Sequence, residues 1–385
     1  MSTGKLLFEK KIIASGILYF LISGILLYKY GIQLGGEAEK YIDNANRILN
    51  NQGLRNGVFG IFYFSYSVIV AFFIKLSLNL LWIAVMQIVL SFTAAFFLYK
   101  MLYGALQKKS TAFLIFCAYL LCYPVQKWNF FLYSESFHSS LLVIGIYLFH
   151  RAITFKNSRA WLAFILLIPV IVFSRPVGII FLFTVTAVMI NWFYRNNKKI
   201  MACWLSLGCV VALVGTVYSP LAAFINPDSI RRMEIICQVP ETKADVGYTE
   251  FNRQGLYQAF KVIKDEIGAG SFLKTGVKKW GYFFGMTRNY YSWYNNLFLM
   301  LFWFVYPLTL LGIFSASAPA YYYIKWTAVL YLALTSVAIF FTCDDWANRF
   351  ISAVFPFILI LAAGGIVSFN KWIKSILIAK LNRNN

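Results

Sequence analysis

A glutamate stands at a candidate helix start in the stretch GGEAEKYIDNANRIL, which runs from Gly35 to Leu49 between two long apolar segments. The apolar residues of this stretch recur at helical spacing, which predicts a short amphipathic helix lying on the bilayer surface. Glu37 falls in its first turn, where the helix dipole favours a negative charge by about 0.3–1 kcal/mol. An acid so placed stays ionised and can accept a proton or bind a cation. An ordinary acid on a solvated loop has the same pattern, so both interpretations stay open.

A second acid opens a later apolar segment and has a histidine close by. Ser134 can cap a helix that begins at Glu135, which is again a favourable site for a carboxylate. Glu135 and His138 are three residues apart and share a helix face, so they could place two ligands on one metal ion. Together with Glu37 they could hold a divalent cation against a phosphate leaving group. The alternative is a polar His138 that is hydrogen-bonded inside the helix bundle.

Two arginines also stand at expected helix starts. Pro176 suits the first position of a helix, which leaves Arg175 at the cap, and Arg349 opens the last apolar segment. Because the dipole disfavours a cation there, the pattern indicates that an anion is expected, and helix amides with guanidinium groups form phosphate sites. The alternative is that both arginines pair with nearby acids such as Glu135 or reach lipid headgroups.

An aromatic segment, RNYYSWYNN, spans Arg288–Asn296 directly before an apolar run. Arg288 and Trp293 are candidates for substrate binding, since aromatic rings can stack on a sugar or grip a prenyl chain. Aromatic belts also occur at membrane interfaces in general, so this interpretation stays open as well.

The elements that position these residues are long apolar segments. The 385-residue chain is 60% hydrophobic and only 13% charged, whereas a soluble domain has about 25% charged residues. Several segments approach the ~20 residues that cross a bilayer, and the pattern predicts an all-α polytopic transmembrane bundle of about 10–12 spans. The apolar segments are Ile12–Tyr28, Phe59–Leu76, Leu80–Tyr99, Ala112–Val125, Phe137–Phe149, Trp161–Phe173, Val177–Phe193, Met201–Ile225, Leu297–Phe314, Tyr322–Phe341 and Phe350–Phe369.

The net charge of +21 lies mostly in the loops between these segments. Basic loops are the cytoplasmic signature and attract anionic lipid, so we expect membrane lipids and no nucleic acid as partners. Placing the loops at Lys100, Arg151, Arg195 and Lys371 inside leaves the acid-bearing loops outside. The basic N-terminus also places Gly35–Gly57 outside, but the two assignments conflict in parity, so one segment is re-entrant or one loop is misassigned.

The large polar stretch before the aromatic segment predicts two interfacial amphipathic helices. The first involves Leu256, Phe260 and Ile263, and the second is expected to be capped by Ser271 and to reach Trp280. The predicted organisation is an N-terminal transmembrane module at 1–225 with a catalytic first loop at 29–57, an extracytoplasmic loop at 226–296, and C-terminal transmembrane helices with a basic tail at 297–385.

The first loop resembles that of a known enzyme superfamily. Gly-Gly-acid-x-x-x-Tyr-x-x-x-Ala after the first transmembrane segment, with Gly36, Glu37, Tyr41 and Ala45, is similar to the first loop of polyprenyl-phosphate-dependent glycosyltransferases. These form the GT-C superfamily, which includes the protein O-mannosyltransferase and aminoarabinose-transferase type. The family normally has Asp where this chain has Glu37, and often Tyr-Pro where it has Tyr66-Ser67.

Three further stretches extend this resemblance in the usual order along the chain. LYSESFHSSLLVIGIYLF looks like the Ser-Glu segment of the family and contains Glu135, and FSRPVGIIFL looks like its Arg-Pro turn and contains Arg175. NRFISAVFPFILILAAGG looks like its C-terminal arginine, proline and helix, with Arg349 and Pro356.

The resemblance implies transfer of a sugar from a polyprenyl-phosphate or polyprenyl-pyrophosphate donor to an acceptor at the extracytoplasmic face, in cell-envelope glycan or glycolipid biosynthesis. Glu37 would be the general base, and Glu135 would position Glu37, a cation or the acceptor. Arg175 and Arg349 would hold the donor phosphate, and Tyr41 would help to bind substrate. The expected location is a bacterial inner membrane with the site facing the periplasm or exterior. The acceptor, whether glycan, lipid or protein, is not specified by these residues.

Two other functions share part of the pattern. A glycan polymerase or ligase of the O-antigen type is also polytopic with essential arginines, but it works without the first-loop acid. A flippase or secondary transporter for lipid-linked sugars usually has repeated halves and midplane charges, whereas these charges cluster at segment ends and no repeat is evident.

Overall fold

The computed structural model describes most of the chain. Some residues with sequence-based predictions lie outside the described ones: Leu256 and Phe260 of the first amphipathic helix, the acids Asp344 and Asp345 that could balance the charge of Arg349, and Cys237 and Cys343, which could form one disulfide. The described residues are 3–54, 57–201, 203–208, 263–315, 318–340 and 348–381.

The described part of the chain is built from helices and contains seven that are long and apolar enough to cross a membrane. Shorter apolar helices accompany them, among them α3 (Phe64–Lys75), α5 (Lys109–Leu121) and α8 (Ser158–Val172). The prediction of an all-α polytopic membrane protein is confirmed. The seven candidate spans lie in α1 (Thr3–Tyr30), α4 (Leu81–Leu106), α7 (Ser134–Phe155), α9 (Gly178–Arg195), the run α14 (Trp293–Met300), η6 (Leu301–Phe304) and α15 (Val305–Phe314), α16 (Pro319–Ile339) and α17 (Ile351–Leu381).

The helices belong to two compact units. This grouping differs from the division into three sequence regions, because most of α15, α16 and α17 groups with the N-terminal helices. The first unit comprises 1–182, 304–329 and 352–385, and the second comprises 183–303 and 330–351.

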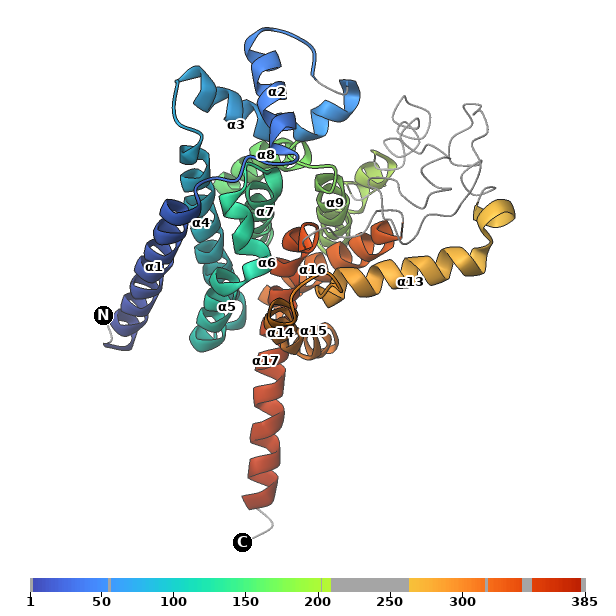
Figure 1. Cartoon of the computed structure of the whole chain (residues 1–385). Coiled ribbons are helices and arrows are strands. Elements are labelled where there is room, and N and C mark those ends of the chain that lie inside the picture. Colours follow the sequence, from blue (N-terminus) through green and yellow to red (C-terminus); the bar gives the residue numbers. More distant parts are fainter. Residues whose placement is uncertain are drawn as a thin grey trace. The chain divides into compact units, whose positions relative to one another are not determined.

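In the first unit, α4 packs against α5 and α7, α7 also packs against α8, and α1 lies beside α4 (Figure 1). A short segment, α6 (Tyr123–Gln126) and η2 (Lys127–Phe130), connects α5 to α7. The small amphipathic helix α2 (Ala38–Leu49) packs against α3.

One glutamine inside apolar α4 fixes the segment that leads into α7. The Gln87 side chain is fully buried, and its amide donates to the carbonyls of Asn129 at 3.1 Å and Phe131 at 3.0 Å. Its carbonyl oxygen accepts a hydrogen bond of 3.1 Å from the Tyr66 hydroxyl on α3. Because an unpaired amide would be costly in an apolar interior, this set of three bonds holds α3, α4 and the start of α7 in a fixed arrangement.

Helices α15 and α17 approach each other so closely that their contact requires glycine. A Cβ at Gly312 would lie 1.9 Å from the carbonyl oxygen of Leu361, and one at Gly365 would lie 1.8 Å from that of Leu308. Thr309 adds a hydrogen bond of 3.2 Å to the Ile358 carbonyl. Small residues allow this backbone contact, which is a common way to associate helices in a membrane.

Replacing Gly365 by Ala is therefore expected to destabilise the first unit, since the added methyl group would push α15 and α17 apart. Overpacking of this kind costs about 1–3 kcal/mol. The matched control is Gly104→Ala in α4, where an added Cβ meets nothing within 4 Å. Thermal unfolding in detergent should give a lower midpoint for Gly365→Ala than for Gly104→Ala, and equal midpoints would contradict the close contact.

Candidate functional site

The first loop is attached to the segment before α7 by backbone and tyrosine contacts. Gln33 forms an isolated bridge with Phe131. The Tyr133 hydroxyl donates to the Gly35 carbonyl at 2.9 Å and accepts from the Glu37 amide at 3.0 Å. One side chain therefore determines where the start of α2 lies relative to the start of α7.

Gly36 is the residue that makes this attachment possible. Its φ is +66°, a left-handed conformation that glycine adopts without strain, and a Cβ there would lie 2.5 Å from the Tyr133 hydroxyl oxygen. Glu37 follows as the N-cap residue of α2 and makes no side-chain cap hydrogen bond. The prediction that Glu37 begins a helix after the glycines is confirmed.

The apolar face of α2 is covered by protein. Ala38, Tyr41 and Ala45 are fully buried, and the Tyr41 ring packs edge-on against Tyr66 with centroids 5.0 Å apart. The Tyr41 hydroxyl shares a hydrogen bond of 2.9 Å with the Ser134 hydroxyl at the start of α7. Contacts with α3 and with the start of α7 therefore cover part of the face that was expected to lie on the bilayer surface. Tyr41 thus connects helices and is not exposed to a substrate.

Glu135 and Arg175 form an ion pair inside the first unit. The Glu135 Oε1 and Arg175 Nη1 atoms are 2.5 Å apart, and the two side chains are 0% and 4% exposed. Glu135 lies in the first turn of α7, and Arg175 lies in the turn between α8 and α9. The sequence left open whether Arg175 binds an anion or pairs with an acid such as Glu135, and the structure contains the pair with Glu135. Removing one partner of such a pair leaves an uncompensated buried charge.

The structure corrects two of the predicted helix starts. Helix α7 begins at Ser134 itself, so this serine does not cap a helix at Glu135, and its hydroxyl contacts Tyr41. Pro176 lies in the turn before α9, which begins at Gly178. A Cβ at Gly178 would lie 2.4 Å from the Ile171 carbonyl oxygen, so close approach to the end of α8 sets where α9 begins.

Lys40 also belongs to this site, although the sequence pattern had not indicated a function for it. Its ammonium lies 3.2 Å from the Glu37 Oε2 atom and 3.7 Å from the centroid of the Tyr63 ring. The carboxylate and the ring face both favour a cation, so they hold the ammonium in place. The i, i+3 spacing of Glu37 and Lys40 was the available signal, because such residues are neighbours on a helix surface.

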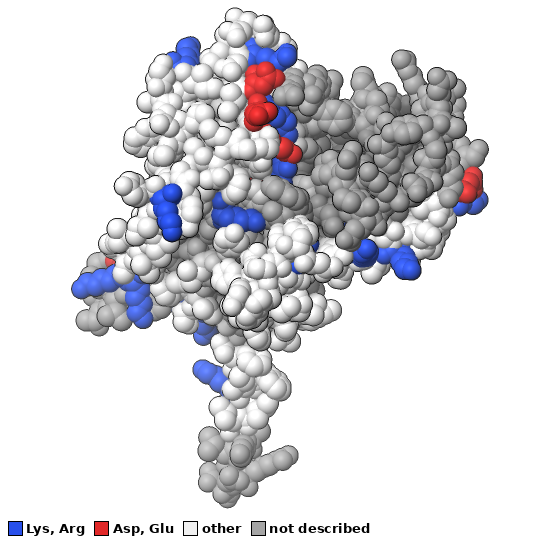
Figure 2. Space-filling model, in the orientation of Figure 1, with Lys and Arg blue, Asp and Glu red and all other residues white. Residues whose placement is uncertain are grey.

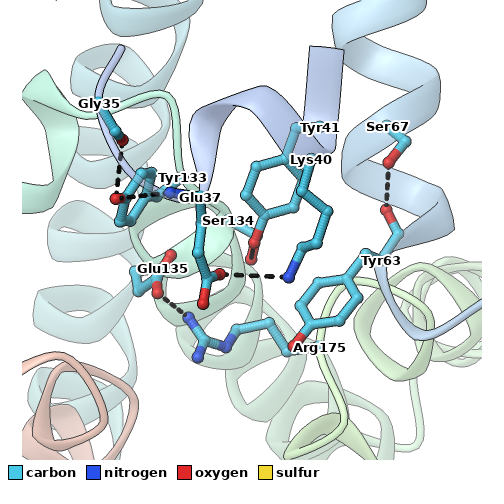
Figure 3. A network of polar contacts seen from close by, with 10 residues as sticks. All are labelled: Gly35, Glu37, Lys40, Tyr41, Tyr63, Ser67, Tyr133, Ser134, Glu135 and Arg175. Carbon is cyan, nitrogen blue, oxygen red and sulfur yellow. Dashed lines mark hydrogen bonds and ion pairs between the residues drawn. The ribbon is translucent and has the colours of Figure 1, made fainter. Parts of the chain in front are cut away.

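The site brings two acids and two cations together. In Figure 3 the side chains of Glu37, Lys40, Glu135 and Arg175 point toward one region, beside Tyr63 and the hydroxyl pair of α2 and α7. Glu37 is 40% exposed, whereas Glu135 is 0% exposed, so only Glu37 can be reached readily by a substrate. Figure 2 shows acidic side chains gathered beside α2 with basic ones next to them.

No protein-family model, curated protein or solved structure matches this chain. The resemblance to the GT-C superfamily therefore stays a prediction, and the functional inference depends on the geometry of the site.

His138 is buried one turn after Glu135. Its Nδ1 atom lies 2.6 Å from the Ser174 hydroxyl, which donates in turn to the Ile171 carbonyl. Because that hydroxyl proton is used, the serine oxygen accepts from the imidazole N–H. The described residues contain no group of three His, Cys, Asp or Glu side chains that could hold a metal ion, and Glu135 is paired with Arg175. The divalent cation expected at Glu37, Glu135 and His138 stays a prediction.

Three predicted site residues belong to the second unit, namely Arg288, Trp293 and Arg349. Arg288 is 4% exposed, and its guanidinium donates to the carbonyls of Tyr282 at 2.6 Å and Thr287 at 2.8 Å, which caps the end of α13 (Ala269–Gly285). Trp293 is 63% exposed and stacks on Tyr294 with centroids 3.8 Å apart. Arg349 is 8% exposed and precedes α17. These contacts give Arg288 a structural role and leave Trp293 accessible.

Proposed function

We propose that this protein is an integral-membrane glycosyltransferase that moves a sugar from a polyprenyl-phosphate or polyprenyl-pyrophosphate donor to an acceptor hydroxyl at the extracytoplasmic face. The observation that carries the proposal is the meeting of one accessible acid, Glu37, with Lys40 and the buried Glu135–Arg175 pair. Seven helices that can cross a membrane suit such a donor, because its long prenyl chain can stay in lipid while the sugar reaches the protein surface.

Glu37 is the proposed general base. Its carboxylate is 40% exposed, so an acceptor hydroxyl can approach it and give up its proton. The acceptor oxygen then forms a bond to the anomeric carbon, and the bond from that carbon to the donor phosphate oxygen breaks. The bonding electron pair leaves with the phosphate, and the configuration at the anomeric carbon is inverted.

Glu135 has a different role in this proposal. Because it is fully buried and paired with Arg175, we assign it as a positioning residue that orients the guanidinium. Arg175 and Lys40 then supply positive charge where the leaving phosphate gains negative charge.

Arg349 keeps the phosphate-binding role that the resemblance implies, as a separate prediction for the second unit, where it precedes α17.

The proposal is tested by the fate of lipid-linked sugars. Cells that lack the protein are expected to accumulate a polyprenyl-linked sugar, and the purified protein in lipid should consume that species when membrane extract supplies the acceptor. An unchanged pool of lipid-linked sugars after deletion, together with no consumption by the purified protein, would contradict the assignment.

Lys40→Met is expected to weaken use of the donor, because the site loses one of its two cations and becomes net negative. Loss of one charged contact predicts a decrease in kcat/KM for the donor of about tenfold or more. The matched control is Arg47→Met. It also removes a cation from α2, one that forms an i, i+4 ion pair with Asp43, and the Arg47 and Asp43 side chains are about equally exposed. Equal donor kinetics for the two variants would remove Lys40 from donor binding.

A further inference from the structure

Helix α13 is amphipathic, and one of its faces packs against other described residues of the second unit. A Cβ at Gly276 would lie 2.1 Å from a ring carbon of Phe340, and the rings of Phe272 and Phe340 have centroids 6.5 Å apart. Lys279 and Phe283 are each only 2% exposed. This side of α13 therefore packs against the residue that directly follows α16.

The neighbouring face of α13 is apolar and exposed. Leu273, Val277 and Trp280 are 57%, 55% and 45% exposed, and they recur at the i, i+4 and i+7 spacing of one helix stripe. Exposing such a stripe of large apolar side chains to water is unfavourable in free energy.

The third face carries positive charge. Lys274 and Lys278 are exposed on the side of α13 away from the buried face, and Ser271 lies on the same side. Figure 2 shows basic side chains along α13 among uncharged ones. Successive faces of one helix thus present a protein contact, an apolar stripe and two ammonium groups.

The position of α13 in the chain places it at a membrane surface. It has 17 residues and three lysines, so it is too short and too charged to cross a bilayer. Its contact residue Phe340 stands at the end of α16, a candidate span, and Trp293 begins the next candidate span eight residues after Gly285. Both neighbours are therefore ends of candidate membrane spans.

We propose that α13 is an in-plane helix that binds an anionic lipid surface. Leu273, Val277 and Trp280 enter the boundary between headgroups and acyl chains, and Lys274 and Lys278 contact lipid phosphates. Charge complementarity selects anionic phospholipid as the occupant, and each lysine strengthens the association about fivefold. This inference does not depend on the proposed transferase activity.

The test uses the full-length protein in nanodiscs, with spin labels at Val277→Cys and at Ser271→Cys in a background without the six native cysteines. With phosphatidylglycerol present, the label at position 277 should collide with oxygen and be protected from a water-soluble nickel chelate. The label at position 271 should show the opposite preference. Equal nickel accessibility at both positions would overturn the lipid-facing assignment.

The second arm tests the lipid class. Replacing phosphatidylglycerol by phosphatidylcholine, or introducing Lys274→Gln with Lys278→Gln, is expected to raise nickel accessibility at position 277 severalfold. The matched control is Lys371→Gln with Lys374→Gln, which removes two exposed charges from α17 and should leave that accessibility unchanged. An apolar stripe that stays protected in both lipids and in both double variants would overturn the selection of anionic lipid.

Discussion

Glu37→Gln is expected to abolish sugar transfer while the protein stays folded and inserted in the membrane. Glutamine has nearly the same shape but cannot accept a proton, so the proposed base is lost, and a loss of about 10²–10⁴-fold in kcat follows. The fold should tolerate the change because the loop is held through the Glu37 backbone amide, which donates to Tyr133, and the side chain caps no helix. Exposed positions of this kind usually change stability by less than about 0.5 kcal/mol.

The matched control for this variant is Glu39→Gln. Glu39 lies two residues further along α2, is exposed, and carries the same charge. Transfer from the lipid-linked donor and the thermal midpoint should both be measured for the two variants. Full activity of Glu37→Gln would exclude Glu37 as the base and would favour a polymerase or ligase that needs no first-loop acid.

Arg175→Met is expected to reduce both stability and activity, with the largest effect on stability among the variants of the site. It leaves the fully buried carboxylate of Glu135 without its guanidinium partner, and breaking a buried pair on one side costs about 3–5 kcal/mol. The exposed pair of Asp43 and Arg47 gives the contrast, because removing Arg47 there should cost about 1 kcal/mol or less. Chemical unfolding in detergent measures both changes.

A double variant separates the two roles of Arg175. Arg175→Met with Glu135→Gln removes both buried charges, so stability should recover much of the loss seen for Arg175→Met alone. Transfer should stay abolished, because the cation that we propose to stabilise the leaving phosphate is still missing. Recovery of transfer in the double variant would mean that Arg175 acts only as the counterion of Glu135 and that another group binds the donor.

Part of this site was predictable from local sequence pattern. Two glycines before an acid indicated a helix start at Glu37, and the spacing of Ala38, Ile42, Ala45 and Leu49 indicated one apolar face, of which Ala38 and Ala45 are buried. Local pattern identifies which residues share a helix face, but it does not determine whether lipid or protein covers that face. The contact of α2 with α3 depends on packing between helices, so the sequence pattern did not predict it.

Other features depend on contacts between distant residues. Ser134 is a good capping residue by type, yet its hydroxyl bonds Tyr41 from a helix far away in the chain. Arg288 was attractive as a substrate contact because of its aromatic neighbours, whereas its donors face backbone carbonyls at the end of α13. The orientation of Lys40 over Tyr63 likewise depends on where α3 begins, which pattern alone does not fix.

The hydrogen bond between the Glu37 amide and the Tyr133 hydroxyl bears on when the site can form during synthesis. Tyr133 is the partner of Glu37 across 96 residues, so during synthesis the acid leaves the ribosome long before the side chain that will orient it. The contact that holds the Glu37 backbone amide cannot form until Tyr133, directly before α7, has been synthesised. In the nascent chain, the proposed site is therefore incomplete until the residues at the start of α7 have been synthesised.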